Sequence, residues 1–283
     1  MPSDKSSARS GEGVNVERIK IIIQKNQKIH PDVILTVKGE TLDKNTLYKL
    51  KKNKNKIVNW FPEPMFQYDL AKKIAPYYDY FFHFDPAIVN KLRNEKHSNV
   101  HYLPFAAAIT PGYKKKIYDV SFIGTYSTNR EKVLSKLTMF NLNIWGDSRW
   151  LKSSLKKNVK GGRISQNKMK NIIKKTKINL NIHNETNLAG ANLRNFEITG
   201  CGGFLLTDYV KDFKNLFNNG KEIVWYKNDN ELINIINFYL KNNKLREKIA
   251  ENCYLKIVKT HNYALRIKHI LELTKTSIPN NTS

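Results

Sequence analysis

An arginine and a glutamate stand three residues apart in the segment NLRNFEITGCGG, residues 192–203, which ends in a pair of glycines. On a helix, Arg194 and Glu197 would be neighbours on one face, while the apolar residues between them could be buried. The glycines would end this helix and allow the strand-like run FLLTD to begin. The segment therefore predicts a short helix that carries one cation and one carboxylate beside a buried strand.

These residue types suit a nucleotide. The helix follows the Gly- and Asn-rich loop NETNLAGAN, which ends at Asn192, and the free N–H groups of a helix start form a cradle for phosphate. Arg194, in the first turn, would add a bidentate cation. Glu197 offers two acceptor oxygens to a pair of vicinal hydroxyls, as on a ribose. The alternative is a surface ion pair between Arg194 and Glu197, which is common on helices and contributes little.

Three residues near other predicted strand ends complete the candidate nucleotide site. Gly124 ends the run YDVSFIG, where close approach of a phosphate to the backbone would require glycine, although an ordinary turn explains it equally well. Arg130 lies near the start of the next helix and could reach a pyrophosphate, or could simply face solvent. Gly146 follows the run NIW and could leave room for the base, or could serve a turn.

Candidates for acid or base chemistry are weaker. His183 ends the run INLNIH and would point toward a ligand, although a single histidine is more often structural. Glu63 and Asp85 lie just beyond strand-like runs in the first half and could serve as the base for an acceptor. Each of these carboxylates adjoins a proline, so a turn or helix-cap role is the alternative. The catalytic residue therefore stays unassigned.

Short apolar runs alternate with amphipathic stretches along the chain, which predicts parallel sheets joined by crossover helices. Sheets of this kind bind ligands outside the carboxyl ends of their strands. The expected fold class is α/β, with two Rossmann-like domains whose parallel sheets face a cleft. Strands are expected at residues 32–37, 56–61, 80–84, 100–105, 118–124, 142–146, 178–183, 204–208 and 221–226.

The turn-rich segment 107–116 is the expected linker between the two domains. We expect an N-terminal domain at 19–110 and a C-terminal domain at 117–275. The polar stretches 1–18 and 276–283 are expected to be disordered tails.

The net charge of +25 favours anionic partners such as nucleic acid, a membrane surface or phosphorylated substrates. Only nine of the 49 basic residues are arginine, whereas proteins that read bases depend on the planar guanidinium. The lysines alternate with asparagines, as on a solvated surface. Composition therefore argues against a specific nucleic-acid partner.

The two cysteines, Cys201 and Cys253, have neither the spacing of metal ligands nor the number that a disulfide framework needs. The longest apolar runs are too short to cross a bilayer. We therefore expect a cytoplasmic protein with no metal site. The basic surface would allow peripheral contact with an anionic membrane at its inner face.

The chain resembles the spore-maturation (CgeB/YkvP-type) glycosyltransferase-like proteins of the GT-B class, which carry a glycosyl transferases group 1-like C-terminal domain. The matching segments of the second half are YDVSFIGTYSTNRE, NIWG, INLNIH, NLRNFEITGCGGFLLTD, NLFNNGKEIVWYKNDNELINIINFYL and LREKIAENCYLKIVKTHNYALRIKHIL. PDVILTVKG, KIVNWFPEP and VHYLPFAA match the first half, so the resemblance runs from about Pro31 to about Leu271.

The resemblance implies transfer of a sugar, of hexosyl type, from a nucleotide-sugar. The donor would bind to the C-terminal domain, and a glycan, lipid-linked or protein acceptor to the N-terminal domain, in the service of cell-surface glycan synthesis. By analogy, Glu197 matches the second glutamate of the E-x7-E pattern in related GT-B enzymes, the one that contacts ribose. The first has no match, because position 189 is Ala189 and the nearest carboxylate, Glu185, is displaced.

The resemblance also implies catalysis without a divalent metal or other cofactor, and the chain has no Asp-x-Asp cluster. The charge of the leaving group would be met by Arg194, the helix start and Arg130.

Family members open with a strand and a glycine loop that this chain replaces with a polar tail and the helix-like residues 15–30. We therefore expect an abbreviated N-terminal domain. A non-catalytic nucleotide- or glycan-binding module is the alternative function. An RNA-associated basic protein is a less favoured one.

Overall fold

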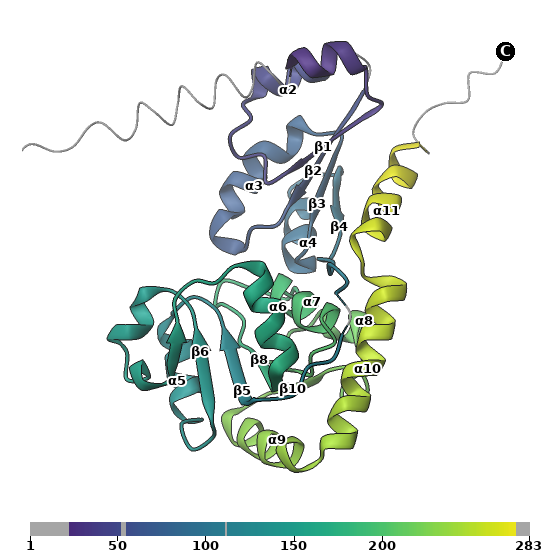
Figure 1. Ribbon diagram of the computed structural model, residues 1–283. Helices are drawn as coiled ribbons and strands as arrows, with labels where there is room; N and C mark the ends of the chain where they lie inside the picture. The colour runs from purple at the N-terminus through teal and green to yellow at the C-terminus, as the bar shows by residue number, and fades with distance from the viewer. Residues whose placement is uncertain (1–22, 52–54, 111, 276–283) are drawn as a thin grey trace, which may run out of the picture. The chain divides into compact units, whose positions relative to one another are not determined.

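The computed structural model describes residues 23–51, 55–110 and 112–275 (Figure 1). Its contacts divide the chain into two compact units. Unit 1 contains the residues up to Leu103 together with the segment from His269 onward, and unit 2 is Pro104–Lys268. The sequence analysis placed the boundary later and assigned 269–275 to the second domain. The predicted tails, 1–18 and 276–283, lie outside the described residues.

Unit 1 is built on a four-stranded parallel sheet with the strand order β1-β2-β3-β4. Because the strands follow one another in one direction, right-handed crossovers place the connecting helices on one face. Side chains from these helices and from alternate strand positions form its core, among them Leu50, Phe61, Phe81 and Leu92. The elements are β1 (Val33–Val37), α2 (Lys44–Lys51), β2 (Lys56–Phe61), α3 (Tyr68–Ile74), β3 (Tyr80–His83), α4 (Pro86–Asn94) and β4 (Val100–Tyr102), with single helical turns at Met65–Gln67 and Ala75–Tyr77.

The end of the last helix, α11 (Tyr263–Lys275), belongs to unit 1. The hydroxyl of Tyr80, a residue of β3, donates a hydrogen bond of 3.0 Å to the carbonyl oxygen of Leu273. Ile270 and Thr274 are buried. A contact between residues so far apart in the sequence leaves no pattern in the residues around either of them. This explains why the sequence analysis left these residues with the second domain.

Unit 2 contains a six-stranded parallel sheet with the order β10-β9-β8-β5-β6-β7. The chain builds outward from β5 to β7 and then returns to the other side of β5 with β8. The loops after β5 and β8 therefore diverge at a switch point, the place where open α/β sheets bind ligands. The strands are β5 (Tyr118–Ile123), β6 (Leu142–Trp145), β7 (Val159–Gly161), β8 (Thr176–Asn181), β9 (Leu205–Asp208) and β10 (Val224–Tyr226).

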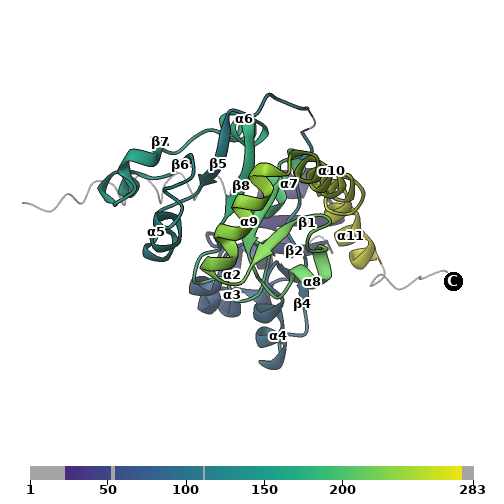
Figure 2. The same ribbon diagram turned by 90° about the horizontal axis from the view of Figure 1, so that it is seen from below.

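Helices cover both faces of the second sheet (Figure 2). Along β8, Ile178 and Leu180 join a core with α5 and α9, while Asn179 and Asn181 bond to α6 and α7 on the other face. The helices are α5 (Thr128–Ser135), α6 (Gln166–Lys175), α7 (Leu193–Gly200), α8 (Phe213–Leu216), α9 (Asp229–Lys241) and α10 (Asn243–Thr260), and single turns occur at Ser148–Lys152 and Lys156–Asn158.

The predicted fold class of two parallel α/β sheets is confirmed. Each of the nine predicted strands corresponds to an observed strand, with ends that differ by up to three residues. The strand that the sequence analysis missed is β7, a three-residue edge strand without an apolar run. Within the described part of the chain, no helix combines the length and the apolar character needed to cross a membrane.

Candidate functional site

A cavity of 240 Å³ lies at the carboxyl ends of β5 and β6 in unit 2. Three of the predicted site residues, Gly124, Gly146 and Arg194, line it together. They come from three separate segments, so only the fold brings them to one place. The other residues of its wall are Ile123, Thr125, Trp145, Asp147, Gly162, Arg163, Ile164 and Met169.

Two of the glycines that line this cavity, Gly124 and Gly146, are required by internal packing. A Cβ atom on Gly146 would overlap the carbonyl oxygen of Gly124 and would lie 2.5 Å from the indole ring of Trp150. That indole donates a hydrogen bond of 2.9 Å to the same carbonyl oxygen. The loops after β5 and β6 therefore touch at backbone distance, and the two glycines allow this contact in the wall of the cavity.

Helix α7 begins beside this cavity, as the sequence predicted. Asn192 is its N-cap residue, and its side-chain oxygen accepts a hydrogen bond from the backbone N–H of Asn195. A second bond comes from the side-chain amide of Asn181 at the end of β8. The Asn192 side chain is thus used by the protein itself, and the remaining N–H groups of the first turn are those that a phosphate could bind.

Arg194 and Glu197 form an ion pair with 2.6 Å between Nη1 and Oε2. The ion pair of the alternative interpretation therefore forms, but it is half-buried, because the two side chains are 23% and 22% exposed. Arg194 Nε also donates to the carbonyl oxygen of Ile123 at the end of β5, and Nη1 contacts the sulfur of Met169. These contacts hold the guanidinium in the wall of the cavity.

The negative charge of the Glu197 carboxylate is only partly compensated by its neighbours. Burial raises its pKa, against the opposing charges of Arg194 and Lys170. One oxygen accepts from Arg194, and Oε1 has no hydrogen-bond partner among the described residues. Glu197 does not itself line the cavity, but it is paired with a residue that does.

Arg130 neither faces solvent nor lines the cavity, so the solvent-facing interpretation is wrong. Its side chain is buried, and Nε and Nη2 donate to the carbonyl oxygen of Ile182 at 3.1 and 2.8 Å. Nη1 donates to the carbonyl and hydroxyl oxygens of Thr125. Arg130 thus ties together the loops that follow β5 and β8, at the switch point. The sequence could not show this, because Ile182 is 52 residues away.

His183 lies in a buried polar chain and has a side chain that is 3% exposed. Its Nδ1–H donates to Asp208 at 2.8 Å, because Nε2 accepts from the amide of Asn195 at 3.0 Å. Asn181 donates in turn to the side-chain oxygen of Asn195. Burial tends to raise the pKa of Asp208, but the contacts with His183 outweigh it and lower that pKa. His183 therefore positions α7 on the sheet.

The two carboxylates proposed as bases lie in unit 1. Asp85 is 1% exposed and caps α4 by accepting from the N–H of Ala87. Glu63 forms an ion pair of 2.5 Å with Lys38, and its side chain is 17% exposed. Of these two candidates, Glu63 thus has the more accessible carboxylate.

Several residues of the site were not foreseen. Asp147 accepts from the N–H of Tyr126 and binds Arg149, whose hydrogen bonds hold the pKa of Asp147 well below its usual range. Asp208 orients His183. Both carboxylates come directly at or after strand ends, which is the signal that could have identified them. Arg163 had no such signal, since its place in the cavity wall follows from the loop after β7.

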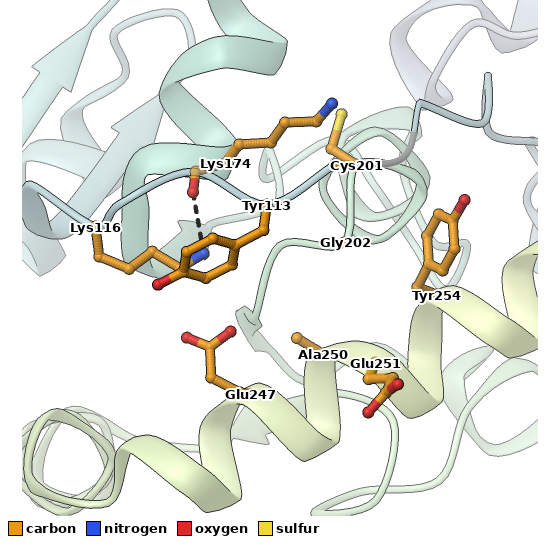
Figure 3. A pocket seen from close by; sticks show the side chains of 10 residues that line it. Tyr113, Lys116, Lys174, Cys201, Gly202, Glu247, Ala250, Glu251 and Tyr254 are labelled. Carbon is orange, nitrogen blue, oxygen red and sulfur yellow. Dashed lines mark hydrogen bonds between the residues drawn. The ribbon is translucent and has the colours of Figure 1, made fainter.

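A second cavity, of 310 Å³, lies at the amino ends of β5, β8 and β9 (Figure 3). Lys116 precedes β5 and donates to the carbonyl oxygen of Lys174 before β8, and Cys201 precedes β9. Glu247 points toward Lys116 from α10, and Glu251 lines the cavity from the same helix. Because ligands of parallel sheets bind at the carboxyl ends, this cavity is separate from the candidate nucleotide site.

Solved structures with a similar fold are glycosyltransferases. Sucrose-phosphate synthase from Thermosynechococcus elongatus superposes with a TM-score of 0.68 at 10% identity, over 93% of this chain and 78% of that one. HepE from Anabaena, in complex with UDP-glucose, gives 0.65 at 12% identity, over 91% and 82%. TarM of S. aureus gives 0.64 at 12% identity, over 90% of this chain and only 58% of TarM. At these identities the likeness establishes the fold, which is that of the GT-B class.

The family follows from the sequence match. A family model described as Glycosyl transferase-like matches residues 130–272, just over half of the chain, so the chain belongs to that family. The matched range includes Arg130, His183, Arg194 and Glu197. No curated protein sequence matches the chain significantly.

The first prediction concerns the contact between the two glycine loops. Gly146→Ala should lower the free energy of unfolding by about 1–3 kcal/mol, because the added methyl group has no space between Gly124 and Trp150. Gly162→Ala is the matched control in the same cavity wall, since its Cβ would meet the nearest atom at 3.8 Å. Chemical denaturation measures both. Equal stability of the two variants would contradict the packing argument.

The second prediction concerns His83, which is 1% exposed. Its Nε2–H donates to the carbonyl oxygen of Glu63, its Nδ1 accepts from the N–H of Asp85, and burial lowers its pKa from 6.5 to about 4. Between pH 6.5 and 4 the unfolded chain therefore binds more protons than the folded one, so stability falls as the pH decreases.

At pH 5 this loss amounts to about 2 kcal/mol relative to neutral pH. His83→Gln removes the titrating group and should remove that part of the pH dependence. Urea unfolding of both proteins at pH 7 and pH 5 measures the difference. The same change with pH in both proteins would show that His83 is not responsible.

Proposed function

We propose that this protein transfers a hexose from a nucleoside diphosphate-sugar to an acceptor, and that unit 2 binds the nucleotide. The observation that carries this proposal is the 240 Å³ cavity at the carboxyl ends of β5 and β6, with Arg194 in its wall. Arg194 is also paired with Glu197, whose second oxygen has no hydrogen-bond partner among the described residues. Membership of the glycosyl transferase-like family supports the reaction class.

Each part of the donor has a matching group in the site. The base would lie in the cavity beside Gly146, and a phosphate would approach the backbone at Gly124. The diphosphate would bind to the first-turn N–H groups of α7 and to Arg194. Glu197 Oε1 would accept hydrogen bonds from the ribose hydroxyls. Asn192 acts as the cap of α7.

The negative charge of the leaving diphosphate is met by fixed protein groups. Arg194 and the positive end of α7 face the place where that charge develops, and such preorganised groups stabilise a transition state strongly. Arg130 contributes indirectly, by holding the loops after β5 and β8. We therefore propose a reaction that needs no divalent metal or other cofactor.

The acceptor side of the proposal rests on the sequence resemblance. A glycan, lipid-linked or protein acceptor would bind to unit 1, in cell-surface glycan synthesis of the CgeB type. HepE, a protein of the same fold, is seen with UDP-glucose, which makes UDP-hexoses the first donors to test. We place the protein in the cytoplasm, and the charge of +25 supports peripheral contact with an anionic membrane.

The third prediction tests the nucleotide site. Calorimetric titration with UDP, GDP, ADP and TDP should identify one that binds, with an affinity that EDTA does not change. Glu197→Ala should weaken that binding by about 1–3 kcal/mol, the range for a hydrogen bond to a charged group. Glu251→Ala on α10 is the control, because this exposed carboxylate lies at the amino ends of the strands.

Two outcomes would change the proposal. An unaltered affinity of Glu197→Ala would remove this residue from the nucleotide site. Nucleotide binding without transfer or hydrolysis of any sugar conjugate would identify a non-catalytic binding module. Release of UDP from a panel of UDP-hexoses, measured with and without candidate acceptors, separates the module from the enzyme.

A further inference from the structure

A shallow groove of 800 Å³ runs beside the edge strand β10 and helix α9 in unit 2. It shares no residue with the candidate nucleotide cavity, which lies at β5 and β6 farther along the sheet. Its wall combines aromatic rings with amides and one carboxylate. The residues are Asn219, Gly220, Val224, Trp225, Asn228, Glu231, Asn234, Ile235, Phe238 and Tyr239.

The charge of this groove differs from that of the whole protein. The chain has 49 lysines and arginines, yet none of them lines the groove, and Glu231 is its one charged residue. The nearest lysines in sequence, Lys221 and Lys227, are not part of its wall. A polyphosphate, a nucleic acid or an anionic headgroup would find no cation there. The groove therefore suits a ligand without negative charge.

Phe238 provides an exposed aromatic ring in the groove, whereas the indole of Trp225 points to the other face of the sheet, because its neighbours Val224 and Tyr226 join the core with α9. Trp225 is stacked on Phe213, with 5.7 Å between ring centroids and 15° between planes, which fixes the indole. Its backbone N–H donates to the side-chain oxygen of Asn219. Phe238 is 49% exposed and stands perpendicular to the ring of Tyr239. A rigid ring with an accessible face can stack on a flat ligand at low entropic cost.

Polar groups beside these rings are available to a ligand. Glu231, Asn234 and Phe238 follow one another at three- and four-residue spacing, so they lie along one face of α9. Asn234 is exposed and makes no hydrogen bond to the described residues. Glu231 Oε2 accepts from the N–H of Lys227, and its other oxygen has no partner within the described chain.

Two further asparagines are held in fixed orientations. The side-chain oxygen of Asn228 accepts from the N–H of Glu231, and that of Asn219 accepts from Trp225. The amino group of each amide makes no hydrogen bond within the described chain and can act as a donor. The groove thus offers both donors and acceptors next to aromatic surface.

We propose that this groove binds a neutral oligosaccharide. A sugar ring presents a face of C–H groups, which suits Phe238, and a rim of hydroxyls, which suits Asn234 and Glu231. Binding in the groove does not depend on the function proposed above. Only the further step, that the bound glycan is an acceptor or product of transfer, rests on it.

The fourth prediction tests the groove with the full chain. Calorimetry and saturation-transfer NMR are performed with maltohexaose, cellohexaose and chitohexaose, and with a heparin hexasaccharide as the anionic comparison. At least one neutral hexasaccharide should bind. Phe238→Ala should weaken that binding about tenfold, the scale of one lost aromatic contact, and Asn234→Ala several-fold.

Asn237→Ala is the matched control, because Asn237 is exposed on the same helix but does not line the groove. Trp225→Phe, whose ring packs on Phe213 on the other face of the sheet, is a second control and should retain most of the affinity. Nucleotide binding, measured on each variant, should stay at the wild-type level. This measurement distinguishes a loss of glycan binding in the groove from a loss of nucleotide binding in the candidate site.

Two results would overturn the proposal. One is the absence of binding of all three neutral hexasaccharides at about 10 mM, a concentration that would reveal even millimolar affinity. The other is binding that Phe238→Ala and Asn234→Ala leave unchanged, which would place the glycan elsewhere on the protein. Displacement of a neutral hexasaccharide by the heparin hexasaccharide would contradict the charge argument.

Discussion

A single buried guanidinium joins the two loops between which the second sheet reverses its strand order. Arg130 donates to the carbonyl oxygen of Ile182 after β8 and to both oxygens of Thr125 after β5. A buried cation is costly unless its donors are satisfied, and burial lowers the pKa of Arg130. The carbonyl groups of Thr125 and Ile182 therefore have to stay in place. They fix the loops at the carboxyl ends of the strands, where Gly124 contacts Gly146.

Helix α7 is fixed on this edge by a chain of side-chain hydrogen bonds. Asn181, Asn195 and His183 form this chain, which ends at the carboxylate of Asp208 and orients the first turn of the helix. Arg194 and Glu197 then occupy defined positions without tertiary ion pairs of their own. A helix that other side chains hold in place keeps its charged groups in fixed positions, and such preorganisation reduces the cost of binding.

The same unit combines two surfaces of different chemistry on one sheet. The cavity at β5 and β6 has arginines in its wall and suits an anionic diphosphate, whereas the groove at β10 has aromatic rings and amides and suits uncharged hydroxyl groups. The high net charge of the chain predicts neither, because the lysines that produce it are distributed over the solvated surface. Local composition within each cavity determines the class of ligand.

The sequence determined which segments form strands and helices, and which of their residues are candidates for ligand binding. Apolar alternation indicated the strands, and the segment from Asn192 to Gly203 indicated a capped helix with Arg194 near its start, because caps, periodicity and glycine stops act over a few residues. Three members of the predicted site, Gly124, Gly146 and Arg194, do line one cavity.

Only the tertiary structure decided where the remaining side chains go. Arg130 binds a carbonyl 52 residues away, His183 binds a carboxylate 25 residues away, and the end of α11 returns to the first unit. The strand β7 and the groove at β10 were equally hidden. Contacts of this range depend on which segments the fold brings together, and no pattern within a few residues records that information.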